Sequence, residues 1–160
     1  MSTTAYISMG SNIGNREGNL RAAIERLREL GNVTAISSLY ETEPVEFTEQ
    51  PWFLNCVVAL ETERTPRELL EGMLEMERAM GRERVQPKGP RVIDLDIVLF
   101  GEQIVEEPQL EIPHPAMHLR RFVLEPLAEI APEAKHPRLN QKARQILADL
   151  PRQGPEVRRL

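Results

Sequence analysis

Apolar residues recur at strand or helix spacing along most of the N-terminal part of the chain. Period-two alternation and runs rich in β-branched residues predict strands at 5–9, 33–40, 53–62 and 92–100. Spacing of three and four predicts helices over 20–30 and 66–80. The order strand, helix, strand, strand, helix, strand is typical of the ferredoxin-like α+β fold, in which both helices cover one side of the sheet. The other side is then available to a ligand.

Residues with known capping preferences mark the ends of both helices. Asn15 can cap the first helix, and Gly31 suits its left-handed stop. Thr65-Pro66-Arg67-Glu68 is a capping box with proline at the first helical position, and Gly81 ends the second helix. The helix over 66–80 is therefore indicated both by its apolar pattern and by its ends.

The C-terminal part of the chain has a less regular pattern. After Gly101 it predicts a short hairpin, a turn at Pro113-His114-Pro115, a helical stretch over 119–130 and a last helix after Asn140. Pro126 should kink or split the helical stretch, because proline removes a backbone hydrogen bond. Residues 151–160 contain few apolar side chains, and we expect this tail to fray.

Two aspartates interrupt the apolar strand at 92–100. The period of two places Asp94 and Asp96 on one face, roughly 7 Å apart. The opposite face carries Ile93, Leu95, Ile97 and Leu99. Aspartate is disfavoured in strands unless its charge is compensated, and Mg²⁺ prefers such oxygen ligands, with phosphate and water completing its shell. The alternative is a solvated edge-strand face, which a bare Asp-x-Asp motif also fits.

The sign of the charge reverses just before these aspartates. The chain has 25 acidic and 20 basic residues and a formal net charge of −5. From 82 to 91, however, a single glutamate faces four basic residues, namely Arg82, Arg84, Lys88 and Arg91. A basic loop beside a carboxylate pair suits phosphoryl transfer, since metal ions bridge the phosphate oxygens while guanidinium groups stabilise the transferring charge. The alternative is an ordinary hydrated loop.

Three further polar positions are candidates for ligand contact. Asn55 lies on the strand face opposite its apolar stripe, and its amide can donate and accept at once when it reads a pterin or purine. His114, between two prolines, can bind phosphate or donate a proton. Gly10-Ser11-Asn12 follows the first strand where N–H groups can hold phosphate, although it lacks P-loop spacing. A satisfied strand asparagine and a rigid surface histidine are the alternatives.

Composition excludes several classes of function. No stretch approaches the roughly 20 apolar residues of a membrane span, and the N-terminus lacks a signal pattern, so we expect a cytoplasmic protein with no membrane partner. The acidic balance argues against nucleic-acid binding. Cys56 is the only cysteine and reads as a packing residue. A chain of 160 residues predicts one domain, and no exposed apolar stripe demands a partner, which favours a monomer.

These residues together resemble a known family, the 6-hydroxymethyl-7,8-dihydropterin pyrophosphokinases of folate biosynthesis. The likeness covers nearly the whole chain. It is carried by Ala-Tyr-Ile-Ser-Met-Gly-Ser-Asn at 5–12, Ser-Ser-Leu-Tyr-Glu-Thr at 37–42, Gln-Pro-Trp-Phe-Leu-Asn at 50–55, Glu77 with Gly81-Arg82, Gly-Pro-Arg-Val-Ile-Asp-Leu-Asp-Ile from 89 and Ile-Pro-His-Pro from 112.

The resemblance implies a ferredoxin-like α+β fold and direct transfer of diphosphate from ATP to the pterin hydroxymethyl group, with AMP released. It implies two Mg²⁺ ions held by Asp94 and Asp96. By matching position, the pterin site comprises Thr42, Glu43, Val45, Phe53, Asn55 and Phe122, with the two phenylalanines sandwiching the ring. Arg82 and Arg91 stabilise the transferring phosphates. The ATP site is completed by Glu77, Arg84, Ile97, His114 and Arg120, and Arg84 lies in a loop that should close over both substrates.

The chain departs from the family pattern at a few positions, and two other functions stay open. Pro87-Lys88 stands where many members carry Arg-Trp, and Phe53 replaces a frequent tyrosine. A nucleotidyltransferase also combines a Gly-Ser turn with Asp-x-Asp on a strand, but keeps the two close in sequence. A ferredoxin-like binding module is the second alternative, and it predicts aromatic residues on a basic sheet face, whereas this face carries two aspartates.

Overall fold

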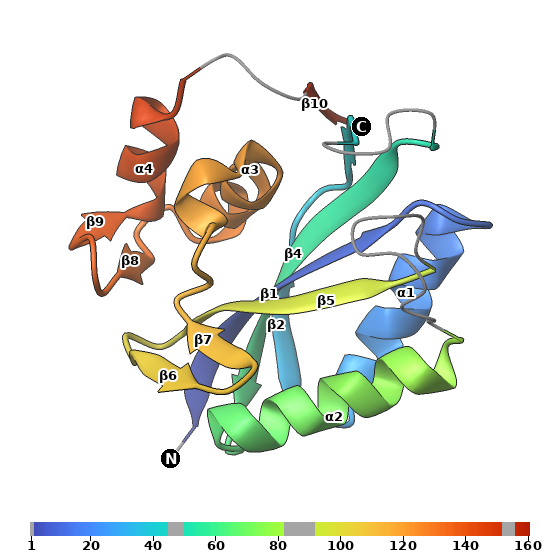
Figure 1. Cartoon of the computed structure of the whole chain (residues 1–160), viewed down its shortest axis with the longest axis horizontal. Coiled ribbons are helices and arrows are strands. Elements are labelled where there is room, and N and C mark those ends of the chain that lie inside the picture. The colour runs from blue at the N-terminus through green and yellow to red at the C-terminus, as the bar shows by residue number, and fades with distance from the viewer. Residues whose placement is uncertain (1, 45–49, 82–91, 152–155) are drawn as a thin grey trace.

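An antiparallel six-stranded sheet forms the centre of the protein (Figure 1). The computed structural model describes residues 2–44, 50–81, 92–151 and 156–160. The strands of this sheet are β1 (Thr3–Ser11), β2 (Asn32–Ile36), β3 (Tyr40–Thr42), β4 (Phe53–Thr62), β5 (Asp94–Phe100) and β10 (Val157–Arg159). Their order is β10-β3-β4-β1-β5, and β2 also pairs with β4. The central strands therefore follow the ferredoxin-like arrangement that the sequence predicts.

Helices α1 (Arg16–Leu27) and α2 (Pro66–Ala79) both cover one face of this sheet (Figure 1). Their apolar faces meet alternate residues of β1, β4 and β5 in the larger core cluster. The predicted N-terminal cap of α1 is confirmed, since the Asn15 side chain accepts from the Gly18 N–H at 3.0 Å. The prediction that Gly31 ends this helix in a left-handed turn is wrong, because α1 already ends at Leu27, with Arg28 in the right-handed conformation as its cap, and Gly31 has no positive φ. Thr65 and Glu68 form the reciprocal capping box, with distances of 3.1 and 2.8 Å. The sequence pattern thus located both helices and the face they bury.

A bulge in β5 changes the face of one predicted core residue. Ile7 of β1 pairs with Ile97, whereas Tyr6 pairs with Leu99, so Val98 is an extra residue on β5. Leu99 consequently packs in the second core cluster, on the opposite face from Leu95. The prediction that all four apolar residues of this strand share one face is wrong for Leu99. The register of Asp94 and Asp96 precedes the bulge and is unaffected.

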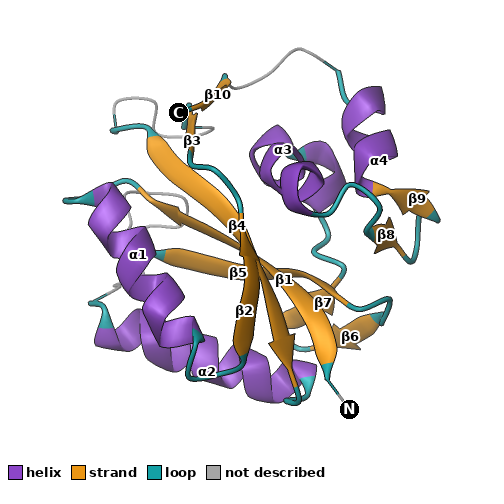
Figure 2. Cartoon of the chain, turned by 180° about the vertical axis from the view of Figure 1, so that it is seen from behind, coloured by secondary structure: helices purple, strands orange, loops and turns teal. Residues whose placement is uncertain are grey.

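The C-terminal extension begins with the hairpin β6 (Val105–Glu107) and β7 (Leu110–Ile112), which packs in the larger core cluster on the side of α1 and α2. The rest of the extension packs on the opposite face of the sheet (Figure 2). It comprises a 3₁₀ turn over Met117–Leu119, α3 (Arg121–Ile130), the strand pair β8 (Lys135–His136) and β9 (Gln141–Lys142), and α4 (Ala143–Asp149). Its apolar residues bury Val57, Val98 and Leu99 of the sheet. The face that the sequence left free is therefore partly covered.

Three predictions about the irregular segments need correction. The predicted strand 33–40 is two strands, β2 and β3, separated at 37–39, and both pair with β4. Pro126 lies inside α3 without splitting it, because the buried face that includes Leu124 and Leu127 holds the helix despite the one missing backbone hydrogen bond. The tail does not fray throughout, since β10 pairs with β3 from Thr42 to Tyr40.

Candidate active site

Strand register brings the carboxylate pair and Asn55 onto one face of the sheet. Gly10 of β1 pairs with Asp94 on one side and with Asn55 on the other, so these three residues form a row across β5, β1 and β4. Asp96 lies in the next row, opposite Ser8. Asp94 and Asn55 are thus two strands apart, or about 10 Å between Cα atoms. Both lie on the face turned away from α1 and α2.

Gly10 makes room for the side chain of Asn55. A Cβ atom at position 10 would lie 2.6 Å from Asn55 Oδ1 and 3.5 Å from the Phe53 ring. The Asn55 amide nitrogen donates to the hydroxyl of Thr42 on β3. Asn55 is 5% exposed, so its orientation is fixed between β3 and the glycine of β1. The sequence analysis missed this role for Gly10. The signal for it was that a glycine on the first predicted strand would lie beside Asn55 if that strand paired with the strand at 53–62.

The predicted phosphate cradle at Gly10-Ser11-Asn12 is not present as such. Gly10 and Ser11 belong to β1 and pair with Asn55 and Leu54 of β4. The Asn12 side chain is buried and donates to the Gln50 side chain at 2.9 Å and to the Pro51 carbonyl at 3.0 Å. Backbone groups that complete a sheet cannot also line an open loop. The segment instead fixes the end of β1 against the start of β4.

The other residues predicted for the pterin site lie at different distances from Asn55. Thr42 is buried beside it, and Phe53 is half-buried on the same strand face. The Glu43 carboxylate is directed to the C-terminal strand, where it accepts from the Glu156 N–H at 3.1 Å. Phe122 is partly buried near the start of α3. Val45 lies outside the described residues.

His114 lies beside β5, close to the carboxylate pair. Its backbone N–H donates to the Val98 carbonyl at 3.1 Å, and its Nδ1 accepts from the Ala116 N–H at 3.1 Å. Burial and the neighbouring Arg120 cation lower the pKa of His114 to about 4, although the Asp94 carboxylate opposes this shift. His114 is therefore neutral near pH 7, with its proton on Nε2.

The remaining residues predicted to bind ATP or its transferring phosphates have different settings. Arg120 ends the 3₁₀ turn, with its Cζ atom 5.6 Å from the centroid of the Phe122 ring. Glu77 is 4% exposed on α2, contrary to the solvated position usual for such a glutamate. The Ile97 side chain packs in the core beneath the sheet, so only its backbone can face the site. Arg82, Arg84 and Arg91 lie outside the described residues.

The carboxylate pair fits Mg²⁺ better than a metal with a full protein ligand set. Within the described ranges, no three His, Cys, Asp or Glu residues cluster as metal ligands. Asp94 and Asp96 are half-buried, on alternate positions of one strand. Mg²⁺ commonly takes one or two protein carboxylates and completes its octahedron with water and substrate phosphates. The donor set on this face therefore suits a magnesium ion that binds together with a nucleotide.

Residues 6–132 match the family described as 7,8-dihydro-6-hydroxymethylpterin-pyrophosphokinase. The chain belongs to this family. The 2-amino-4-hydroxy-6-hydroxymethyldihydropteridine pyrophosphokinase of Bacillus subtilis is 47% identical over 137 residues, which are 84% of this chain and 82% of that protein. The enzyme of the same name from Pseudomonas aeruginosa is 39% identical over 153 residues, 94% of each chain. Membership of the pyrophosphokinase family leaves no support for the nucleotidyltransferase and binding-module alternatives.

Some relatives of this pyrophosphokinase are much longer. The folic acid synthesis protein fol1 of Schizosaccharomyces pombe is 41% identical over 152 residues, but the match spans only 21% of its length. The crystal structure of Plasmodium falciparum HPPK-DHPS with pteroate aligns with 92% of this chain and 42% of that chain, at a TM-score of 0.74 and 17% identity. That likeness supports the fold. None of the helices within the described ranges has the length and apolarity needed to cross a bilayer.

Proposed function

We propose that the chain carries out the reaction of its family on the sheet face that Asp94, Asp96 and Asn55 share. The reaction transfers diphosphate from ATP to the hydroxymethyl group of 6-hydroxymethyl-7,8-dihydropterin, in folate biosynthesis. The observation that supports this location is the strand register, in which Gly10 of β1 lies between the carboxylate pair on β5 and the side-chain amide of Asn55 on β4. A pterin held at Asn55 would thus lie within reach of phosphates held at Asp94.

Asp94 and Asp96 would hold two Mg²⁺ ions together with the phosphates of ATP. When bound, such ions neutralise phosphate charge and draw the attacking hydroxyl and the phosphate chain together. No other carboxylate shares this strand face in β5, so the pair is the natural anchor for the metal. The rest of each coordination shell would come from phosphate oxygens and water.

The residues around Asn55 hold and orient the pterin. The Asn55 amide, already fixed by Thr42, presents its carbonyl oxygen over Gly10 and reads the polar edge of the heterocycle. Phe53 and Phe122 provide the two stacking surfaces. In this pose the hydroxymethyl group is directed toward β5, where its oxygen attacks the β-phosphorus of ATP. The bond between the β-phosphorus and the oxygen that bridges it to the α-phosphorus breaks, AMP leaves with that oxygen, and the hydroxyl proton is released to solvent.

The cationic and imidazole side chains stabilise the phosphates. Neutral His114 offers an Nε2–H donor, because Nδ1 is occupied by the Ala116 N–H. Arg120 adds a positive charge near it. Arg82 and Arg91, with Arg84, remain our candidates for the transferring groups and the closing loop, on the residue match alone. Most of the rate then comes from positioning and charge stabilisation rather than from covalent chemistry.

The experiment that tests this function is to incubate the protein with ATP, Mg²⁺ and 6-hydroxymethyl-7,8-dihydropterin and to separate the products by chromatography. AMP and a diphosphorylated pterin in equal amounts support the proposal. Release of pyrophosphate, formation of ADP, or no turnover in the presence of Mg²⁺ contradicts it. A parallel reaction with EDTA tests the metal requirement, and activity that survives EDTA contradicts the role of Asp94 and Asp96 as metal ligands.

Three expectations from the sequence stay predictions. They are the single-domain organisation over residues 1–160, the monomeric state and the cytoplasmic location.

A further inference from the structure

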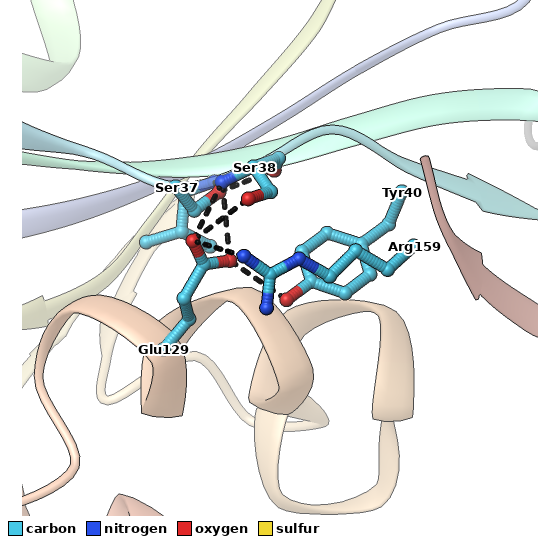
Figure 3. A network of polar contacts seen from close by, with 6 residues as sticks. Ser37, Ser38, Tyr40, Glu129 and Arg159 are labelled. Atoms are coloured by element: carbon cyan, nitrogen blue, oxygen red, sulfur yellow. Dashed lines mark hydrogen bonds and ion pairs between the residues drawn. The ribbon is translucent and has the colours of Figure 1, made fainter.

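Glu129 is the acceptor at the centre of a polar network that joins three separate segments (Figure 3). Its carboxylate accepts from the Ser38 N–H at 3.0 and 3.1 Å, from the Ser38 hydroxyl at 2.9 Å and from the Tyr40 hydroxyl at 2.7 Å. It also pairs with Arg159 of the C-terminal strand at 3.4 Å. One side chain of α3 thus holds the turn before β3, β3 itself and β10.

The pKa values in this network are consistent with a charged carboxylate. Burial alone would raise the pKa of Glu129, but hydrogen bonds from Tyr40 and Ser38 outweigh it and keep the pKa below its usual range. Burial and the Glu129 contact together raise the pKa of Tyr40 well above its usual value. Tyr40 therefore stays a hydroxyl donor and Glu129 a charged acceptor at neutral pH, a combination that makes a strong hydrogen bond.

The strand side of the network reaches the residues proposed to read the pterin. Tyr40 is 3% exposed and pairs directly with Asn55 across the β3–β4 ladder. Two residues further along β3, Thr42 accepts the Asn55 amide. The neighbouring Ser37 hydroxyl accepts from the Val57 N–H at 2.9 Å, so the same turn is also attached to β4. A shift of β3 would therefore move Thr42 and release the Asn55 side chain.

On the helix side, the network is connected to Phe122, which is one wall of the proposed pterin slot, the space between the Phe53 and Phe122 rings. Phe122 and Glu129 are seven residues apart on α3, which is nearly two helical turns, so both lie on the same face of the helix. Fixing Glu129 against β3 sets the rotation of α3 and hence the direction of Phe122. A flat ring stacked between two aromatic walls needs about 7 Å between them, given carbon contacts of about 3.5 Å on each side.

We infer that Glu129 is a positioning residue for the pterin site, because it fixes the helix of Phe122 relative to the strands of Thr42 and Asn55. This inference rests on the proposed function and assigns to the α3–β3–β10 junction the task of setting the width of the pterin slot. Within the part of the chain that the structure describes, the hydrogen bonds and ion pairs of Glu129 go to Ser38, Tyr40 and Arg159, and none goes to the carboxylate pair or to His114. The loss of Glu129 should therefore affect pterin binding and leave ATP binding largely intact.

The test compares Glu129→Ala, Glu129→Gln and Tyr40→Phe with a matched control. Glu133→Ala is that control, since Glu133 is also a carboxylate in an ion pair. Its partners are Lys142 at 2.5 Å and Arg144 at 2.9 Å, and neither of these cations belongs to β3 or β10. Steady-state kinetics with each substrate varied in turn, and thermal melts, are measured for every variant. The full-length chain is used throughout.

Glu129→Ala should raise KM for the pterin roughly tenfold, which corresponds to the net contribution of one charged hydrogen bond, while KM for ATP changes less than about twofold. Glu129→Gln keeps an acceptor for Ser38 and Tyr40 and should recover most of the loss. Tyr40→Phe removes a single hydrogen bond and should raise the same KM by a smaller factor, without depending on how well Glu129→Ala folds.

Two results would overturn the inference. One is an unchanged KM for the pterin in both Glu129→Ala and Tyr40→Phe. The other is an equal rise in both KM values, or a rise also in Glu133→Ala, which would indicate general destabilisation. If the wild-type protein itself released no AMP, the proposed function would fail instead, so the two failures can be told apart.

Discussion

Replacing Gly10 with alanine should damage pterin recognition while the sheet stays intact. The Cβ atom would lie 2.6 Å from Asn55 Oδ1, closer than real Cβ atoms approach any neighbour, so Asn55 has to move. Gly10 is not in the left-handed region, and its backbone conformation suits alanine. The displaced Asn55 would lose its hydrogen bond with Thr42, a net contribution of about 1 kcal/mol.

The effect on activity should be larger than the effect on stability. Overpacking typically costs roughly 1–3 kcal/mol of unfolding free energy, which shows as a lower melting temperature. Misplacing a positioning group by about 1 Å can cost on the order of 100-fold in rate. We therefore expect kcat/KM for the pterin to fall by about two orders of magnitude in Gly10→Ala, measured as AMP formation at saturating ATP, with KM for ATP nearly unchanged.

A double-mutant cycle shows whether the effect acts through Asn55. Asn55→Ala removes the group that collides with the new methyl, so Gly10→Ala should do little further harm in that background. Gly72→Ala is a matched control, because its Cβ would lie 2.8 Å from the flexible end of Leu30, away from the proposed site. Wild-type kcat/KM in Gly10→Ala, or the same fold-loss with and without Asn55, would refute the reasoning.

Two further predictions concern the carboxylates and the histidine. Asp94→Asn or Asp96→Asn should abolish turnover while the melting temperature matches that of wild type, because half-buried carboxylates on a sheet face add little to packing. Asp149→Asn on α4 is the control. Full activity in either Asp94→Asn or Asp96→Asn would contradict the assignment of these residues as metal ligands. The pKa of His114 is about 4 when folded, below its ordinary value near 6.5, so the unfolded chain binds the extra proton and stability should fall as pH drops from about 6.5 to 4. In metal-free buffer, His114→Asn should make the melting temperature fall less steeply over that window, and an unchanged slope would contradict the burial of this ring.

The fold was largely predictable because most elements carry local signals. The capping box at Thr65, the period of three and four in α1 and α2, and the alternation in β4 each depend on neighbouring residues. The misses share a different origin. β10 is held by pairing with β3 and by ion pairs of Arg158 and Arg159 with carboxylates that are distant in sequence. No local sequence pattern predicts these contacts.

The candidate site was predictable as a set of residues but not as an arrangement. Asp94, Asp96 and Asn55 are polar residues within apolar strands, and this local feature identified them as candidate site residues. That Gly10 separates them, and that Glu43 turns to the C-terminal strand, depends on strand register and on contacts between distant segments. The bulge that turns Leu99 to the opposite face likewise follows from pairing with β1 rather than from the sequence of β5.

The most direct test of the central claim follows the phosphorus atoms of ATP. Two reactions are run with the wild-type protein, Mg²⁺ and the hydroxymethyl pterin, one with ATP labelled at the α-phosphorus and one with ATP labelled at the β-phosphorus. We predict that the α label remains in AMP and that the β label appears in the pterin diphosphate. A β label that stays in ADP or leaves as free pyrophosphate would contradict diphosphate transfer by this protein.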